Sequence, residues 1–134
     1  RPLSQVVLDA SVAGRWLIDT NLAPDLQALH ARVAKHGAFV PTIFRYEMAN
    51  LLTTFARTLK GQVQPAVAAL VSWPLYIDLR TPLIHDHIAL AIAHNLSAYD
   101  ATYVELALRR ALPLATLDRK LAAAARAVGV EVVP

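Results

Sequence analysis

Cysteine is absent from the 134-residue sequence, and its absence limits the chemistry that the chain can carry. Without thiols there are no disulfide bonds and no thiolate metal sites, so a metal would be held by carboxylates, histidines or backbone oxygens. No run of 18 apolar residues is present, which argues against a membrane-spanning helix, and the start of the chain shows no secretory signal. We therefore expect a cytoplasmic protein.

Glycine is also scarce, with four residues that form neither a G-x-G-x-x-G fingerprint nor a P-loop. This argues against nucleotide-binding sites of those two kinds. Ser11 lacks the G-x-S-x-G surroundings of a nucleophile elbow, which argues against a serine hydrolase of that type. His85 and His87 are two residues apart in a segment with helical periodicity, so they would not share a helix face and a metal site between them is disfavoured.

What the sequence does contain is a large apolar fraction and a mild positive charge. Hydrophobic residues make up 56% of the chain, enough for a core without covalent cross-links, and the length predicts one domain over residues 1–134. The net charge is +3 and the isoelectric point is near 9.6. Such a balance permits binding to a polyanion without requiring it.

Apolar runs alternate with segments of helical periodicity along the whole chain. The predicted strands cover residues 5–8, 39–40, 76–79, 114–116 and 130–133. The predicted helices cover residues 11–18, 24–36, 42–60, 65–73, 83–95, 98–111 and 119–127. This alternation predicts an α/β fold, a three-layer α/β/α sandwich with a central, mostly parallel five-stranded sheet. Thr42 is expected to cap the third helix and Gly61 to end it.

Two aspartates follow directly after predicted strands. Asp9 comes after the apolar run VVL, and Asp118 closes the segment PLATLD. Open α/β sheets place their sites beyond the carboxyl ends of the strands, where strand order reverses. If the first and fourth strands are neighbours there, both carboxylates reach the same crevice.

Two further acids lie on predicted helices. Asp100 falls in the first turn of its helix or caps it, and taken alone it is better explained as a capping residue than as a catalyst. Glu47 lies on the rim of the apolar stripe of its helix, about 40° from Leu51 and about 60° from Phe44. Asn50 continues that polar edge and could steady Glu47 or a water molecule.

Four carboxylates that converge without a cation would repel one another and raise their pKa values. A divalent metal resolves this conflict, and Mg²⁺ or Mn²⁺ accepts carboxylate oxygens while keeping positions open for phosphate. Such ions can activate water and stabilise the leaving oxygen of a phosphodiester. The acids therefore indicate metal-dependent phosphoester chemistry.

The ordered set VVLDAS with Asp9, RYEMAN with Glu47, AYDATYVELA with Asp100 and ATLD with Asp118 resembles the motifs of PIN-domain ribonucleases. The similarity is greatest to VapC-type toxins of toxin–antitoxin pairs. It implies a PIN-like fold, Mg²⁺- or Mn²⁺-dependent endoribonuclease activity, a homodimer and a cognate antitoxin. Many members carry another acid soon after the fourth aspartate, whereas Arg119 and Lys120 follow here, so the resemblance leaves open whether one or two metals bind.

The resemblance also assigns roles. Asp9 and Asp118 would bind the metal most directly, and Glu47 and Asp100 would bind it or its waters, one of them acting as general base. Ser11, Asn50 and Thr116 match supporting positions near the family's acids. Positively charged side chains at the rim, with Arg15, Arg45 and Arg119 as candidates, would hold RNA phosphates.

Two other functions stay open at this point. One is a PIN-like binding or scaffold domain that has lost its activity, and the other is a metal-dependent phosphatase acting on small phosphoesters. The aromatic residues do not interleave with basic residues as they do in RNA-binding modules, and they are expected in the core or at a dimer interface: Phe39, Phe44, Trp73, Tyr99 and Tyr103.

Overall fold

A computed structural model describes residues 4–58 and 62–134. Its strands are β1 (Val6–Leu8), β2 (Ala38–Pro41), β3 (Leu75–Asp78), β4 (Leu114–Ala115) and β5 (Val132–Val133). Its helices are α1 (Ala10–Ile18), α2 (Pro24–His36), α3 (Ile43–Thr58), α4 (Val63–Ser72), α5 (Ile84–Ala93), α6 (Ala98–Arg110) and α7 (Arg119–Ala127). All strand pairs are parallel, in the order β3-β2-β1-β4-β5, so the predicted α/β/α class is confirmed.

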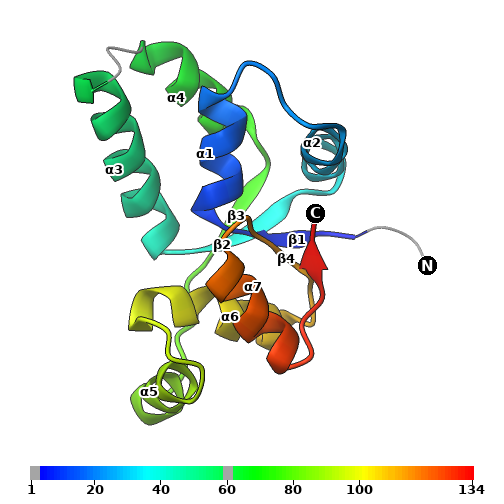
Figure 1. The fold of residues 1–134 in the computed structure, drawn as a ribbon, viewed down its shortest axis with the longest axis vertical. Coiled ribbons are helices and arrows are strands. Elements are labelled where there is room, and N and C mark those ends of the chain that lie inside the picture. The colour runs from blue at the N-terminus through cyan, green and yellow to red at the C-terminus, as the bar shows by residue number, and fades with distance from the viewer. Residues whose placement is uncertain (1–3, 59–61) are drawn as a thin grey trace.

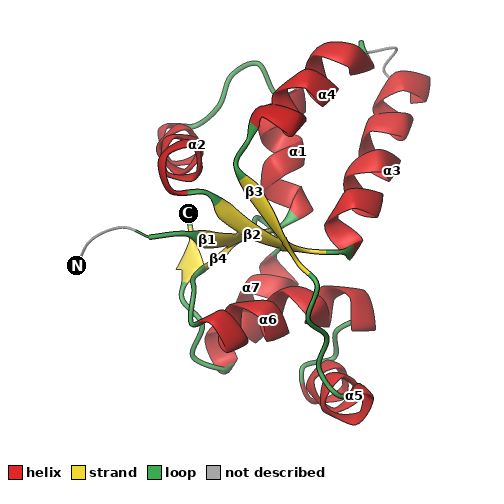
Figure 2. Cartoon of the chain, turned by 180° about the vertical axis from the view of Figure 1, so that it is seen from behind, coloured by secondary structure: helices red, strands yellow, loops and turns green. Residues whose placement is uncertain are grey.

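Helices cover both faces of this sheet (Figure 1). Helices α1 to α4 lie on one side, and α5, α6 and α7 lie on the other, as the reverse view also shows (Figure 2). The central strand β1 is fully buried because Val6 and Leu8 pack into the first core cluster while Val7 packs into the second. Successive strand side chains point to opposite faces, so a strand covered on both sides must be apolar throughout.

The ends of some elements differ from the sequence-based expectation. Helix α4 begins at Val63, two residues before Pro65, because proline is tolerated within the first turn of a helix. Strand β5 pairs only at Val132 and Val133, although Val130 is buried in the second core cluster. The expected helix end at Lys60 and Gly61 lies outside the described residues. Among the described residues, no helix is long and apolar enough to cross a membrane.

Helices α1 and α3 approach closely at Gly14, although a glycine inside a helix lowers the stability of that helix. A Cβ atom at this position would lie 2.5 Å from Cδ1 of Leu51. The missing side chain therefore makes room for α3 to pack on α1. This contact sets the separation between the helix that follows Asp9 and the helix that carries Glu47.

A buried ion cluster joins the edge strand β3 to α6. Asp78 is 5% exposed and accepts hydrogen bonds from Nη1 of Arg109 at 3.0 Å and from Nε of Arg110 at 2.6 Å. Arg109 also donates to Glu105 at 2.6 Å, one helical turn away. Burial opposes the charge on Asp78, but the two arginines and the Arg80 backbone N–H outweigh it and lower its pKa to about 2.

We predict that Asp78→Asn lowers the free energy of unfolding at pH 7 by about 2 kcal/mol, since the folded pKa lies below the unfolded value near 3.8. Because the folded pKa is depressed, this contribution is complete above about pH 4 and is lost as pH falls through 2. Urea denaturation at pH 7 and at low pH measures it. Asp19→Asn is the matched control, because the Arg15–Asp19 pair is exposed and contributes little. Equal losses in both variants would contradict the prediction.

Candidate active site

The four predicted acids lie around the carboxyl edge of the parallel sheet. Asp9 follows β1 and Asp118 follows β4, and these two strands are hydrogen-bonded neighbours. Asp100 lies in the first turn of α6, and Glu47 lies in the second turn of α3, which follows β2. The adjacency of β1 and β4, on which the sequence argument depended, is therefore confirmed.

Asp9 is held by two hydroxyl groups. It is 6% exposed, and its Oδ2 atom accepts from Ser11 Oγ at 2.6 Å and from Thr116 Oγ1 at 2.7 Å. Its Oδ1 atom has no donor among the described residues, and no buried side-chain oxygen there lacks a hydrogen bond, so Oδ1 is open to solvent. The scaffold thus fixes one oxygen of Asp9 and leaves the other for a ligand.

The two hydroxyls are themselves oriented by the backbone after β4. The N–H of Leu117 donates to Ser11 Oγ, and the N–H of Asp118 donates to Thr116 Oγ1, each at 3.0 Å. A hydroxyl has one proton to donate, and here that proton goes to Asp9. The loop that positions Asp118 therefore also positions Asp9.

Asp118 caps helix α7. Its Oδ1 atom accepts from the backbone N–H groups of Lys120 at 3.0 Å and Leu121 at 3.1 Å. This satisfies two of the helix's unpaired N–H groups and holds the side chain in one orientation. Its Oδ2 atom has no protein donor among the described residues, as is the case for Oδ1 of Asp9.

Glu47 is half-buried and is fixed by a tyrosine. The hydroxyl of Tyr103, a residue 0% exposed, donates to Glu47 Oε1 at 2.5 Å. Burial raises the pKa of Glu47, the Tyr103 bond opposes this, and the charges of Asp9 and Asp100 raise it further. Burial together with the Glu47 carboxylate raises the pKa of Tyr103, so its hydroxyl remains a donor.

Asp100 is in the first turn of α6, but the capping residue is Ser97, whose Oγ accepts from the Asp100 backbone N–H at 3.0 Å. The Asp100 carboxylate is half-buried. Burial raises its pKa, and the neighbouring charges of Asp118 and Asp9 raise it further. A side-chain hydrogen bond with the capping residue Ser97 opposes this rise, so the Asp100 carboxylate also contacts the cap of its own helix.

The mutual effects on pKa link the four acids into one electrostatic cluster. Glu47 responds to Asp9 and Asp100, and Asp100 responds to Asp9 and Asp118. Within residues 4–58 and 62–134, however, no three His, Cys, Asp or Glu side chains are close enough together to coordinate one metal ion. Mg²⁺ binds proteins through one or two carboxylates and keeps several waters, so a spread carboxylate set suits this ion.

The donors fit a hard divalent cation. Asp9, Glu47 and Asp118 each use one carboxylate oxygen for the scaffold, while the described residues offer no donor to the second oxygen. Hard ions such as Mg²⁺ and Mn²⁺ prefer such oxygen ligands. A bound cation would also relieve the repulsion that raises the pKa values of Glu47 and Asp100.

Other predicted site residues take smaller parts. Asn50 is exposed and, in the described part of the chain, makes no hydrogen bond to Glu47, which Tyr103 holds instead. Arg45 and Arg119 are exposed on the helices that carry or follow Glu47 and Asp118. The exposed Arg15 pairs with Asp19 at 3.1 Å.

Tyr103 contacts the candidate site, a role that its sequence pattern does not predict. It is buried, as expected of a core residue, but its hydroxyl reaches Glu47 from a position 56 residues away in the chain. Its only local signal is its place one helical turn after Asp100.

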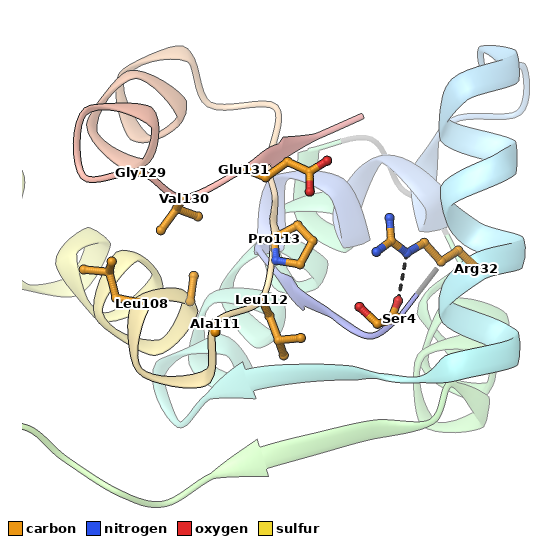
Figure 3. A pocket seen from close by; sticks show the side chains of 10 residues that line it. Ser4, Arg32, Leu108, Ala111, Leu112, Pro113, Gly129, Val130 and Glu131 are labelled. Atoms are coloured by element: carbon orange, nitrogen blue, oxygen red, sulfur yellow. Dashed lines mark hydrogen bonds between the residues drawn. The ribbon is translucent and has the colours of Figure 1, made fainter. Parts of the chain in front are cut away.

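The acidic cluster lies apart from a cavity at the opposite edge of the sheet. A cavity of about 510 Å³ lies near the amino ends of β1, β4 and β5, and its charged lining residues are Arg32 and Glu131 (Figure 3). Arg32 Nε donates to the Ser4 carbonyl oxygen at 2.8 Å. None of the four acids lines this cavity.

Comparison with known proteins supports the same architecture. The sequence profile of the PIN domain family matches residues 6–127. The chain is similar to the crystal structure of PAE2754 from Pyrobaculum aerophilum, with a TM-score of 0.70 and 24% identity, over 98% of this chain and 90% of that chain. This likeness is one of fold. A search of curated proteins finds no match.

We predict that Tyr103→Phe raises the pKa of Glu47 in the metal-free protein, because the hydroxyl that stabilises the ionised carboxylate is removed. NMR titration of the glutamate side-chain carboxyl carbons measures this shift. Tyr99→Phe is the matched control, since Tyr99 is 66% exposed on the same helix. An unchanged Glu47 titration in Tyr103→Phe would show that the hydrogen bond has no effect on this carboxylate.

Proposed function

The chain belongs to the PIN domain family, whose members are generally metal-dependent nucleases, and we propose that it is an endoribonuclease dependent on Mg²⁺ or Mn²⁺. The observation that carries this proposal is the electrostatic coupling of Asp9, Glu47, Asp100 and Asp118 at one edge of the sheet. An acidic edge repels RNA unless a cation neutralises it, so the site favours a metal-dependent reaction on a phosphodiester.

In this proposal the role of each acid follows from its hydrogen bonds and its burial. Asp9 and Asp118 would hold the ion, since each has a carboxylate oxygen without a donor among the described residues. When bound, Mg²⁺ or Mn²⁺ acidifies a coordinated water and stabilises charge on phosphate oxygens. Glu47, whose pKa is raised and whose Oε1 is fixed by Tyr103, is suited to take the proton from the attacking water. Asp100 adds a fourth negative charge to the acidic cluster.

Ser11 and Thr116 keep Oδ2 of Asp9 fixed during this reaction. Arg45 and Arg119 are exposed and available to RNA phosphates, while Arg15 would first have to leave Asp19. Asn50 would act through a water molecule. These are supporting roles in binding and orientation.

We predict that Asp118→Asn reduces metal-dependent RNA cleavage by more than about 100-fold, because loss of even an outer partner of a metal costs 10–100-fold. Asparagine caps helices as well as aspartate does, and the lost charge relieves repulsion, so thermal stability should stay the same or rise. Cleavage of a labelled structured RNA with Mg²⁺, Mn²⁺ or EDTA, together with thermal melting, measures both.

The control for this assay is Asp25→Asn, which removes an acid from the first turn of α2, outside the acidic cluster. Full activity of Asp118→Asn, or cleavage that persists in EDTA, would contradict the proposal. Turnover of small phosphoesters with no RNA cleavage would favour the phosphatase alternative. Tight RNA binding without hydrolysis of either substrate would favour the silent scaffold.

We further propose that this nuclease is a VapC-type toxin inhibited by a cognate antitoxin. The support is the ordered set of four motifs, together with an open acidic edge that a partner segment can cover. Expression in a bacterial host should arrest growth, the Asp118→Asn variant should not, and co-expression of the antitoxin should restore growth. Growth unaffected by the wild-type chain would count against a toxin.

A homodimer is also proposed, and α5 offers a surface for it. The inner face of α5 packs on α6 through Leu90 and Ala91, whereas Ile84, Ile88 and Ile92 form an exposed stripe on another face. In both views α5 lies at the end of the molecule, away from the sheet (Figures 1 and 2). Exposed apolar stripes of this kind mark interaction surfaces.

We predict that Ile88→Lys shifts the protein from dimer to monomer, because a charge in the middle of an apolar interface has no partner when buried. Sedimentation velocity over a range of protein concentrations measures the change. Leu108→Lys is the control, since Leu108 is 43% exposed on α6, outside the stripe. The same mass for the wild type and for Ile88→Lys would show that α5 is not a dimer interface.

A further inference from the structure

A second hollow lies at the carboxyl edge of the sheet, beyond the acids. This cleft of about 400 Å³ is formed by the ends of β2 and β3, the segment that leads into α5, and the side of α6. Its volume is in the ordinary range for small-ligand sites. Its lining includes Arg80, Thr81, Pro82, Ile84, His87 and Thr102, together with Asp78, Glu105 and Arg109 of the ion cluster.

The cleft continues the same edge on which the acidic cluster lies. Strands β1, β2 and β3 are parallel and adjacent, so their carboxyl ends share one side of the sheet. With neighbouring strands about 4.8 Å apart, the end of β3 is about 10 Å from the end of β1 that precedes Asp9. Thr102, which lines the cleft, lies on the same helix as Asp100 but on another face of it, since residues two apart on a helix do not face each other. A chain laid along this edge would pass from the acids to the cleft.

The charges in the cleft leave one cation uncompensated. Asp78, Glu105, Arg109 and Arg110 neutralise one another through the ion cluster that joins β3 to α6. Arg80 is exposed, and its guanidinium has no ion pair among the described residues. The cleft thus offers a positive group to an anionic ligand.

The walls combine apolar surface with hydrogen-bonding groups. Pro82 provides partly exposed apolar ring surface, and Thr81 provides an exposed hydroxyl. Nε2 of His87 lies 2.6 Å from the Ala98 carbonyl oxygen, which can only accept, so Nε2 carries the proton. In the neutral ring Nδ1 is then an acceptor, suited to an exocyclic amino group.

We propose that this cleft is a nucleotide subsite, which holds one nucleotide of the RNA substrate close to the scissile bond. Arg80 binds its phosphate, the Pro82 ring contacts the base, and His87 and Thr81 hydrogen-bond to the base edge. The inference rests on the proposed ribonuclease function and adds to it a position at which sequence is read. Phosphate contacts fix register, and contacts to the base provide specificity.

The first test measures RNA binding in the cleavage-deficient Asp118→Asn background by fluorescence polarisation over a range of salt concentrations. The logarithm of the RNA affinity falls linearly with the logarithm of the salt concentration, and a lost phosphate contact on single-stranded RNA makes this slope smaller by about 0.7. The loss of affinity in Arg80→Ala should therefore become about 5-fold smaller when the salt concentration rises tenfold. Arg126→Ala, at the far end of α7, removes the same charge outside the cleft and should keep the parent slope.

The second test sequences the products that the active protein makes from a randomised single-stranded RNA pool. A base preference at one position within two nucleotides of the cut is expected, and Thr81→Trp, which fills the cleft, should abolish this preference and lower the cleavage rate. Parent-like slopes in Arg80→Ala, or an unchanged preference in Thr81→Trp, would overturn the subsite alone. A wild-type protein that neither binds nor cleaves RNA would overturn the ribonuclease proposal itself.

Discussion

The site depends on a carboxylate at the end of the most buried strand in the sheet. Strand β1 is wholly apolar, and Asp9 follows it while remaining nearly inaccessible. Two hydroxyls make this burial possible by donating to one oxygen, and both are oriented by backbone N–H groups of the loop after β4. This network ties β1 to β4 beyond their short ladder and gives Asp9 one fixed orientation.

In Asp118 and Glu47, as in Asp9, one carboxylate oxygen accepts hydrogen bonds from the fold, and the described residues offer no donor to the other. Asp118 caps α7 with Oδ1, and Glu47 accepts from a buried tyrosine with Oε1. Such anchoring holds like charges together at the edge of the sheet in spite of their repulsion, which raises the pKa values of Glu47 and Asp100. In the nuclease that we propose, a cation bound at this edge would relieve the repulsion that the scaffold maintains.

Periodicity predicted the strands and helices because each element has a regular apolar pattern, while the element ends depended on neighbours. Val130 could not be separated from β5 by sequence, since it is buried as a strand residue would be but lies outside the ladder. The interactions of Tyr103 and Asp78 were not predicted, for a related reason. Their partners, Glu47 for the first and Arg109 and Arg110 for the second, are more than 30 residues away, and no local spacing records such pairs.

The sequence by itself determined the α/β class, the position of each acid at the start of a helix or on its rim, and the absence of thiol chemistry, since these follow from residue type and local period. Only the tertiary structure decided that β1 and β4 are neighbours, that Tyr103 and not Asn50 holds Glu47, and that a cleft extends the acidic edge towards β3. These contacts join segments far apart in the chain, and they depend on strand order and helix packing, which local periodicity does not specify.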